Sequence, residues 1–368
     1  MSRLASCGAQ GGLSVKGLGR DRGTRADSGH CDARGNVQKF KIVDLFAGAG
    51  GWSLAAQHLG VPAVGVEWPL GACETRRAAD LATVEEDVRK LGPGDFPEEN
   101  VLVGRPPAQT FTVVGHGPGH AALTQVINFV GRMARREDLG AELVAAKDGR
   151  AALTLEPLRW ALAALDDDCA YEAIALVQGP SVLPVWEAMA EVLAAEGYSV
   201  ACGRLAAEQY GVPQTRRVSV MIARRDGDAA LPPPTHRAFR KGRDEGDPLL
   251  LPWVSMGEAL YRPHSFEAIS NYGIGGDPRA RRRRTNGEPA FTVTGKISRI
   301  RLVTPRGAEL PRLTHNEAGQ LQTFPGSFPW TGRDVAQHIG NTVPPLLGAH
   351  ILAAALDLPA PANTWPRD

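Results

Sequence analysis

The chain has 368 residues, of which 43% are hydrophobic and 22% charged, close to the usage of ordinary globular proteins. This length predicts one large domain or two. The formal net charge of +1 excludes a global positive field, so any contact with nucleic acid must come from a local basic patch. The five scattered cysteines form no CxxC pair, which argues against a disulfide framework or a zinc site. No stretch approaches the ~18 consecutive apolar residues of a membrane span. Together with the scattered cysteines, this leads us to expect a cytoplasmic protein without bound metal.

Residues 1–38 are rich in Gly, Ser and Arg and show neither helical nor strand periodicity. We therefore expect a disordered tail, either inert or acting as a basic arm toward DNA. Apolar strand-like runs then alternate with stretches of helical period. The predicted strands are 41–46, 63–67, 100–103, 174–177 and 218–223, and the predicted helices are 52–59, a section from 121 to 165 interrupted near 147–150, and 182–196. This alternation predicts an α/β fold with a doubly wound, mostly parallel sheet.

The composition changes to Pro, Gly and Arg with short strand-like runs between residues 226 and 310, which predicts a second, smaller domain. Predicted helices at 316–323 and 343–356 return to the style of the first domain. We therefore expect the large domain to comprise 39–225 and 311–358, the smaller one 226–310, and a C-terminal tail 359–368.

A glycine turn, DLFAGAGG at residues 44–51, lies between the first predicted strand and helix. Small residues there let a ligand approach the backbone and a helix N-terminus, but the spacing is not GxGxxG, which disfavours a dinucleotide. Glu67 ends the second strand and can accept hydrogen bonds from ribose hydroxyls. Asp87, expected at the end of the third strand, can accept an adenine amino group. These residues alone leave two alternatives, an adenosine-containing cofactor or a tight turn with two solvated carboxylates.

The glycine turn, followed by Glu67 and Trp68, resembles the first two motifs of the cytosine-C5 DNA methyltransferases. Further segments follow in the family's order. RPPAQTF (105–111) resembles the catalytic Pro-Pro-Cys loop, VQGPSV (177–182) the Glu-Asn-Val strand end, QTRRV (214–218) the Gln-x-Arg-x-Arg motif, and segments 312–325 and 340–345 the last two motifs. The resemblance implies a Rossmann-like class I methyltransferase fold with a target-recognition domain at 226–310.

The resemblance also implies S-adenosylmethionine, or its product S-adenosylhomocysteine, as the cofactor. By the same resemblance the cofactor pocket comprises Asp44, Phe46, Gly48, Gly50, Glu67, Trp68, Asp87, Asn341 and Val343. All nine positions hold residues that suit this role.

The catalytic motifs depart from the family's pattern. The family's covalent reaction needs a thiolate that adds to cytosine C6 and an acid at N3, acting on a base flipped out of the helix. Ala108 stands at the nucleophile position and Val177 at the acid position. Gln214 and Arg216 of the later motif are present. Losing the nucleophile of a covalent mechanism costs on the order of 10⁶ in rate, so the sequence predicts an inactive protein.

Several explanations of this loss stay open. The one that we favour is a natural pseudoenzyme that binds cofactor and DNA and assists an active methyltransferase or a defence-system partner. A second is a DNA (cytosine-5-)-methyltransferase of a restriction-modification system that was inactivated by engineering at Ala108. Others are methylation of DNA or RNA by another route, and a vestigial protein that binds neither ligand.

A basic cluster lies between residues 279 and 306, where nine Lys and Arg stand against one acid, a local charge of +8. Segment 288–296 is predicted to form a strand that enters a DNA cleft. A solvated basic loop is the alternative, but the resemblance favours double-stranded DNA with a flipped cytosine as the partner, in the bacterial nucleoid. The predicted DNA-binding residues are Gln109, Arg281, Arg282, Arg283, Arg284, Lys296 and Arg299.

Overall fold

The computed structural model describes residues 39–107, 118–145, 152–243, 246–270 and 282–362. Several predictions fall outside these ranges, namely the tail at 1–38, the helix interruption near 147–150, and the site residues Ala108, Gln109 and Arg281. They remain predictions.

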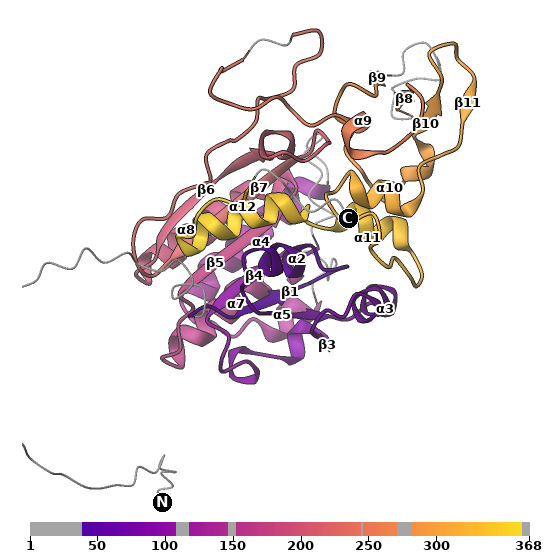
Figure 1. Ribbon diagram of the computed structural model, residues 1–368. Helices are drawn as coiled ribbons and strands as arrows, with labels where there is room; N and C mark the ends of the chain where they lie inside the picture. Colours follow the sequence, from indigo (N-terminus) through magenta and orange to yellow (C-terminus); the bar gives the residue numbers. More distant parts are fainter. Residues whose placement is uncertain (1–38, 108–117, 146–151, 244–245, 271–281, 363–368) are drawn as a thin grey trace, which may run out of the picture. The chain divides into compact units, whose positions relative to one another are not determined.

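A seven-stranded sheet in the order β3-β2-β1-β4-β5-β7-β6 forms the centre of the fold (Figure 1). The first five strands in the chain run parallel, and β7 lies antiparallel between β5 and β6. This confirms the predicted α/β fold with a doubly wound, mostly parallel sheet. The strands are β1 (Ile42–Leu45), β2 (Ala63–Glu67), β3 (Thr83–Glu85), β4 (Val101–Gly104), β5 (Ala173–Gln178), β6 (Ser199–Ala206) and β7 (Arg217–Arg224).

Helices cover both faces of this sheet, because alternate residues of its strands point to opposite sides. On β1, Val43 and Leu45 pack with one group of helices, whereas Ile42 packs with the other. The first group is α4 (Pro118–Ala134), α5 (Gly140–Ala145), α7 (Glu156–Asp166) and α8 (Leu183–Ala195). The second is α2 (Gly51–His58) and the yellow α12 (Pro345–Leu356) of Figure 1. Helix α3 (Leu70–Ala78) contacts β3.

A second, four-stranded antiparallel sheet has the order β11-β10-β8-β9. Its core joins apolar residues of this sheet to α10 (His315–Gln320) and α11 (Val335–Asn341). The remaining elements are α9 (Met256–Ala259), β8 (Glu267–Ile269), β9 (Arg283–Thr285), β10 (Arg301–Val303) and β11 (Glu309–Leu310), with 3₁₀ turns η1 (Val88–Lys90), η2 (Pro93–Asp95), η3 (Pro180–Val182), η4 (Ala207–Tyr210) and η6 (Ile297–Arg299).

Two sequence-based expectations are wrong. The predicted helical section from 121 to 165 already breaks after α4, where Arg136 adopts a φ of 57°. Segment 288–296 is not a strand, because its polar groups bond to the loop of Gln214 and not to a neighbouring strand. The N–H of Ala290 donates to Pro213, and the N–H of Val293 donates to the side chain of Gln214.

The stretch Val335–Leu356 is long and apolar enough to cross a membrane by length and composition. In the fold, 89% of its apolar window is buried. It consists of two helices, α11 and α12, because Pro344 and Pro345 interrupt the hydrogen-bond ladder between them.

Candidate functional site: a cavity at the carboxyl edge of the sheet

A cavity of about 1150 Å³ opens at the carboxyl ends of the parallel strands, where ligands bind in open α/β sheets. It brings together residues from β2, from the loop after β4, from the end of β5 and from α11. Eight of the residues predicted from the sequence line it: Phe46, Gly48, Glu67, Trp68, Asp87, Arg216, Lys296 and Asn341. Asp44, Gly50, Val177, Gln214, Val343 and Arg299 are not among its lining residues.

The glycine turn forms one wall of the cavity with a backbone that few residues tolerate. Phe46 and Gly48 both have left-handed φ angles, 60° and 55°. For a bulky residue such as Phe46 this conformation is strained, a feature that concentrates at functional sites. The Gly48 N–H donates to Oε2 of Glu67 at 2.5 Å. A Cβ on Gly51 would lie 2.2 Å from the carbonyl oxygen of Val343, so glycine there permits the contact between α2 and the turn before α12.

Glu67 and Asp44 are two buried carboxyls beside this turn. Oε1 of Glu67 accepts the Trp68 N–H at 3.0 Å, and burial raises the pKa of Glu67 although these backbone bonds oppose the change. Asp44 is fully buried, and neither of its oxygens has a hydrogen-bond partner. Burial raises the pKa of Asp44 well above its ordinary value, against the opposing charge of the buried Arg76. Glu67 therefore faces the cavity, whereas Asp44 lies beneath it.

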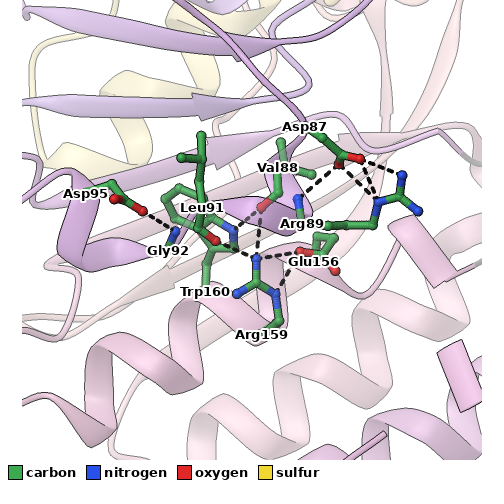
Figure 2. Close-up of polar contacts among 9 residues, drawn as sticks. All are labelled: Asp87, Val88, Arg89, Leu91, Gly92, Asp95, Glu156, Arg159 and Trp160. Carbon is green, nitrogen blue, oxygen red and sulfur yellow. Dashed lines mark hydrogen bonds and ion pairs between the residues drawn. The ribbon is translucent and has the colours of Figure 1, made fainter. Parts of the chain in front are cut away.

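Asp87 is held by a short network that Figure 2 shows. It accepts the backbone N–H of Arg89 at 3.1 Å, and both of its oxygens accept the Arg89 guanidinium. Burial alone would raise the pKa of Asp87, but these bonds outweigh burial and lower it. Behind it, Arg159 donates to the carbonyls of Val88 and Leu91, which fixes the turn. The Arg89 guanidinium also lies 5.7 Å from the Trp68 ring centre, so Asp87, Arg89 and Trp68 form one group.

The end of β5 presents an amide to the cavity. Gln178 lines it, donating from Nε2 to the Pro106 carbonyl and accepting the Gly179 N–H at Oε1. Val177, the predicted acid position, is fully buried and packs in the core on the α12 side. Neighbouring residues of a strand point to opposite faces, so only one of the two can face the cavity. Sequence reasoning missed Gln178 as the cavity-facing residue, although the alternation of β5 carried the signal.

Gln214 and Arg216 play different parts. Gln214 is fully buried and joins three segments, donating to Leu321 and Gln322 and accepting from Val293. Arg216 lines the cavity and donates to the carbonyls of Gly340 at 2.8 Å and Val293 at 3.3 Å. A second arginine, Arg105, also lines the cavity and was not among the predicted site residues.

The predicted DNA-binding arginines are not equivalent. Arg284 is clamped between the rings of Phe239 and Phe291, 4.8 and 4.5 Å from the ring centres, and donates to the carbonyl of Ala290. Arg283 is exposed and pairs with Glu267 at 3.0 Å. Arg282, Lys296 and Arg299 are exposed, and of these Lys296 lines the cavity.

No thiol of the described residues lines the cavity. Cys73 is a buried residue of α3, and burial raises its pKa to about 11. Burial likewise raises the pKa of Cys202 to about 12. Cys169 is exposed but follows α7, at the amino end of β5 and not at the carboxyl edge that carries the cavity. A thiolate nucleophile is therefore missing from the described part of the cavity wall.

Comparison with known proteins agrees with this geometry. A family model described as C-5 cytosine-specific DNA methylase matches residues 40–128, which span the glycine turn, Glu67, Asp87 and the loop after β4. The type II methyltransferase M1.HphI of Haemophilus parahaemolyticus is 27% identical over 350 residues, covering 86% of each protein. The family model and these relatives support the cytosine-C5 DNA methyltransferase family for this chain. The type II methyltransferase M.AplI of Arthrospira platensis is also similar, 27% identical over 324 residues and 84% of each protein.

Among solved structures, the Dnmt2 methyltransferase of S. pombe has the same fold, with a TM-score of 0.54 and 14% identity. The match covers 86% of this chain and 98% of that one. This likeness supports the class I methyltransferase fold.

The cofactor of this family is S-adenosylmethionine, and the cavity's residues fit its adenosine end. Glu67 has free lone pairs for ribose hydroxyls, and Trp68, 60% exposed, offers a flat apolar face at the opening. Asp87 supplies carboxylate oxygens for an amino group. When bound, the cofactor would supply an electrophilic methyl group.

Proposed function

We propose that this protein is a non-catalytic member of its family that binds S-adenosylmethionine or S-adenosylhomocysteine together with DNA. The observation that carries the proposal is the contrast within one cavity. Glu67 and Asp87 line it with carboxylates, which supports adenosine binding, whereas the wall where the base would react offers Gln178 and no thiol among the described residues.

The chemistry explains why these two changes abolish the reaction. The methyl group of Ala108 cannot form a bond to cytosine C6, so the C5–C6 double bond is never activated. An amide such as Gln178 can donate a hydrogen bond to the base, but it cannot transfer a proton to N3. Gln178 can still orient a flipped cytosine, so base binding and base chemistry are separable in this cavity.

The proposed assignments follow from this division. The cofactor pocket comprises Phe46, Gly48, Glu67, Trp68, Asp87 and Asn341, with Asp44, Gly50 and Val343 supporting it. Residues 39–225 and 311–358 form the methyltransferase-type domain and 226–310 the DNA-recognition domain. The partners are double-stranded DNA, with its cytosine flipped into the cavity, and an active methyltransferase or defence protein of the bacterial cytoplasm.

The proposal is tested by calorimetric binding of S-adenosylhomocysteine together with covalent trapping on DNA that contains 5-fluorocytosine. The trapping reaction contains S-adenosylmethionine as the methyl donor. A thiolate that attacks C6 of this base, followed by methyl transfer from S-adenosylmethionine to C5, leaves a stable adduct, because fluorine cannot leave C5 as a cation. We expect cofactor binding and no adduct on a denaturing gel, whereas the Ala108→Cys/Gln178→Glu double variant should form one. An adduct with the natural chain would overturn the proposal and reveal another nucleophile.

A further inference from the structure

Two arginines stand on the cavity wall away from its carboxylates. Arg105 follows β4, where its N–H donates to Leu45 at 3.2 Å and its Nη1 donates to the Thr342 carbonyl at 3.1 Å. Arg216 precedes β7, is only 7% exposed, and donates to the Gly340 carbonyl. Both guanidinium groups therefore hold the same short segment, Gly340–Thr342, at the C-terminal end of α11.

The two positive charges are not neutralised by the described residues. The bonds of both side chains go to carbonyl oxygens, and neither forms an ion pair with a carboxylate of the described part of the chain. Burial and the charge of Arg216 lower the pKa of Arg105 well below its ordinary value. Burial lowers the pKa of Arg216 to about 10. Two desolvated like charges oppose folding, and an anion placed between them would remove that cost.

The order of the strands separates these cations from the acids of the cavity. Glu67 and Asp87 follow β2 and β3, at one edge of the sheet, whereas Arg105 and Arg216 adjoin β4 and β7 on the other side of β1. Toward β3 the cavity therefore carries Glu67 and the Asp87–Arg89 ion pair, and toward β7 it carries two arginines with no acidic partner among the described residues. A ligand that carries hydroxyl and amino donors at one end and an oxyanion at the other matches this polarity.

We infer that Arg105 and Arg216 form an oxyanion site that takes the carboxylate at the amino-acid end of the cofactor. The inference rests on the proposed function, in which the acidic end of the cavity holds the adenosine. The contacts of both arginines with the turn beside Asn341, a proposed cofactor residue, place the site next to the cofactor and not at the outer DNA surface. A backbone phosphate of the target strand has the same oxyanion chemistry and is the alternative source.

The test compares two nucleosides that differ at the amino-acid end. S-adenosylhomocysteine carries the carboxylate, and 5′-deoxy-5′-methylthioadenosine lacks it. Binding of both is measured by calorimetry with the natural chain, with Arg105→Gln, and with Arg204→Gln, which removes an exposed charge on β6 outside the cavity. We expect Arg105→Gln to weaken the binding of S-adenosylhomocysteine about 10- to 100-fold, which corresponds to the loss of one charge-assisted hydrogen bond. The affinity for methylthioadenosine should stay unchanged. Arg204→Gln should change neither.

The other results separate the alternatives. Arg105→Lys should recover part of the affinity for S-adenosylhomocysteine, because it keeps the charge. If Arg105→Gln instead leaves both nucleosides unchanged but lowers the salt dependence of DNA binding by about one counterion, the anion is a phosphate and the carboxylate assignment is wrong. Equally weakened binding of both nucleosides, or an unchanged affinity for every ligand, would also overturn the carboxylate assignment. If the natural chain binds neither nucleoside, the proposed function itself fails.

Discussion

The two ends of the cavity differ in the chemistry of their side chains. Toward β3 the side chains have the chemistry that an adenosine cofactor needs, with Glu67 and Asp87 held in place by backbone and arginine bonds. Toward β7 the described part of the wall carries the amide of Gln178 and two arginines, Arg105 and Arg216, and no thiol. In the proposed function, binding and catalysis therefore depend on separable parts of one site. A protein can lose the second while the fold that supports the first stays intact.

Restoring the reactive end should have the largest effect. We expect Ala108→Cys/Gln178→Glu to transfer methyl groups from S-adenosylmethionine to DNA at least about 100-fold faster than Ala108→Cys alone, because general acid catalysis contributes about 10²–10⁴. The measurement is isotope incorporation into DNA under single-turnover conditions. Equal rates for the single and double variants would show that Gln178 is not at the acid position.

Placing the acid one residue earlier should damage the fold and not the chemistry. Val177→Glu buries a carboxylate in the apolar core, so we expect the free energy of unfolding to fall by about 3–5 kcal/mol. Gln178→Glu, at the cavity wall, should change it by less than about 1 kcal/mol. Urea unfolding of the two variants measures the contrast. Similar losses in both would contradict the orientation of β5.

Removing the charge of Glu67 should weaken cofactor binding without affecting the fold. Glu67→Gln keeps the shape and removes the charge that accepts the Gly48 N–H and that, in the proposed pocket, would accept the ribose hydroxyls. We expect about 10- to 100-fold weaker binding of S-adenosylhomocysteine in calorimetry. Glu98→Gln, a change in an exposed ion pair with Lys41, is the matched control and should leave the affinity unchanged. Unaltered affinity in Glu67→Gln would remove this residue from the pocket.

Within the basic cluster at 279–306, we expect Arg284 to stabilise the fold and Arg282 to contact DNA. Arg284→Ala loses two ring contacts and its bonds to Thr215 and Ala290, so we expect a loss of about 2 kcal/mol in the free energy of unfolding. Arg282→Ala should leave stability within about 0.5 kcal/mol but lower the salt dependence of DNA binding by about one counterion. Thermal unfolding measures the stability of the two variants, and fluorescence anisotropy measures their DNA binding. A stability loss in Arg282→Ala and a DNA-binding change in Arg284→Ala alone would contradict these roles.

The smallest effect concerns pH. Burial raises the pKa of Asp44, so the folded state favours its neutral form. This contribution to stability is complete below the unfolded pKa of about 3.9 and is lost as pH rises through the higher folded value. Asp44→Asn should flatten this decline in urea unfolding series run upward from pH 4. An unchanged slope would mean that Asp44 is ionised in the fold.

The sheet and the cofactor end could be predicted from sequence because their signals are local. Apolar runs broken by glycine identify β1 and β2, and an acid at a strand end lies at the carboxyl edge. Strand β6 has no such signal, since Gly203 and Arg204 interrupt its apolar residues. Its place beside β7 depends on long-range pairing.

The basic end could not be predicted fully, because its arrangement depends on contacts between distant segments. Arg105 and Arg216 are far apart in the chain and meet only at the turn before α12. Arg284 looks like a DNA-binding residue in sequence, yet Phe239 and Phe291 hold it in place. The motif alignment placed the acid position on Val177, whereas the geometry of β5 turns Gln178 toward the cavity.

The central claim, that cofactor binding survives without methyl transfer, is tested most directly by one experiment on the natural chain. Tritium-labelled S-adenosylmethionine is mixed with stoichiometric protein and DNA of random sequence, and bound cofactor and labelled DNA are counted in the same sample. We expect retained cofactor with no label in DNA above a protein-free control. Label in the DNA, lost on Glu67→Gln, would contradict it.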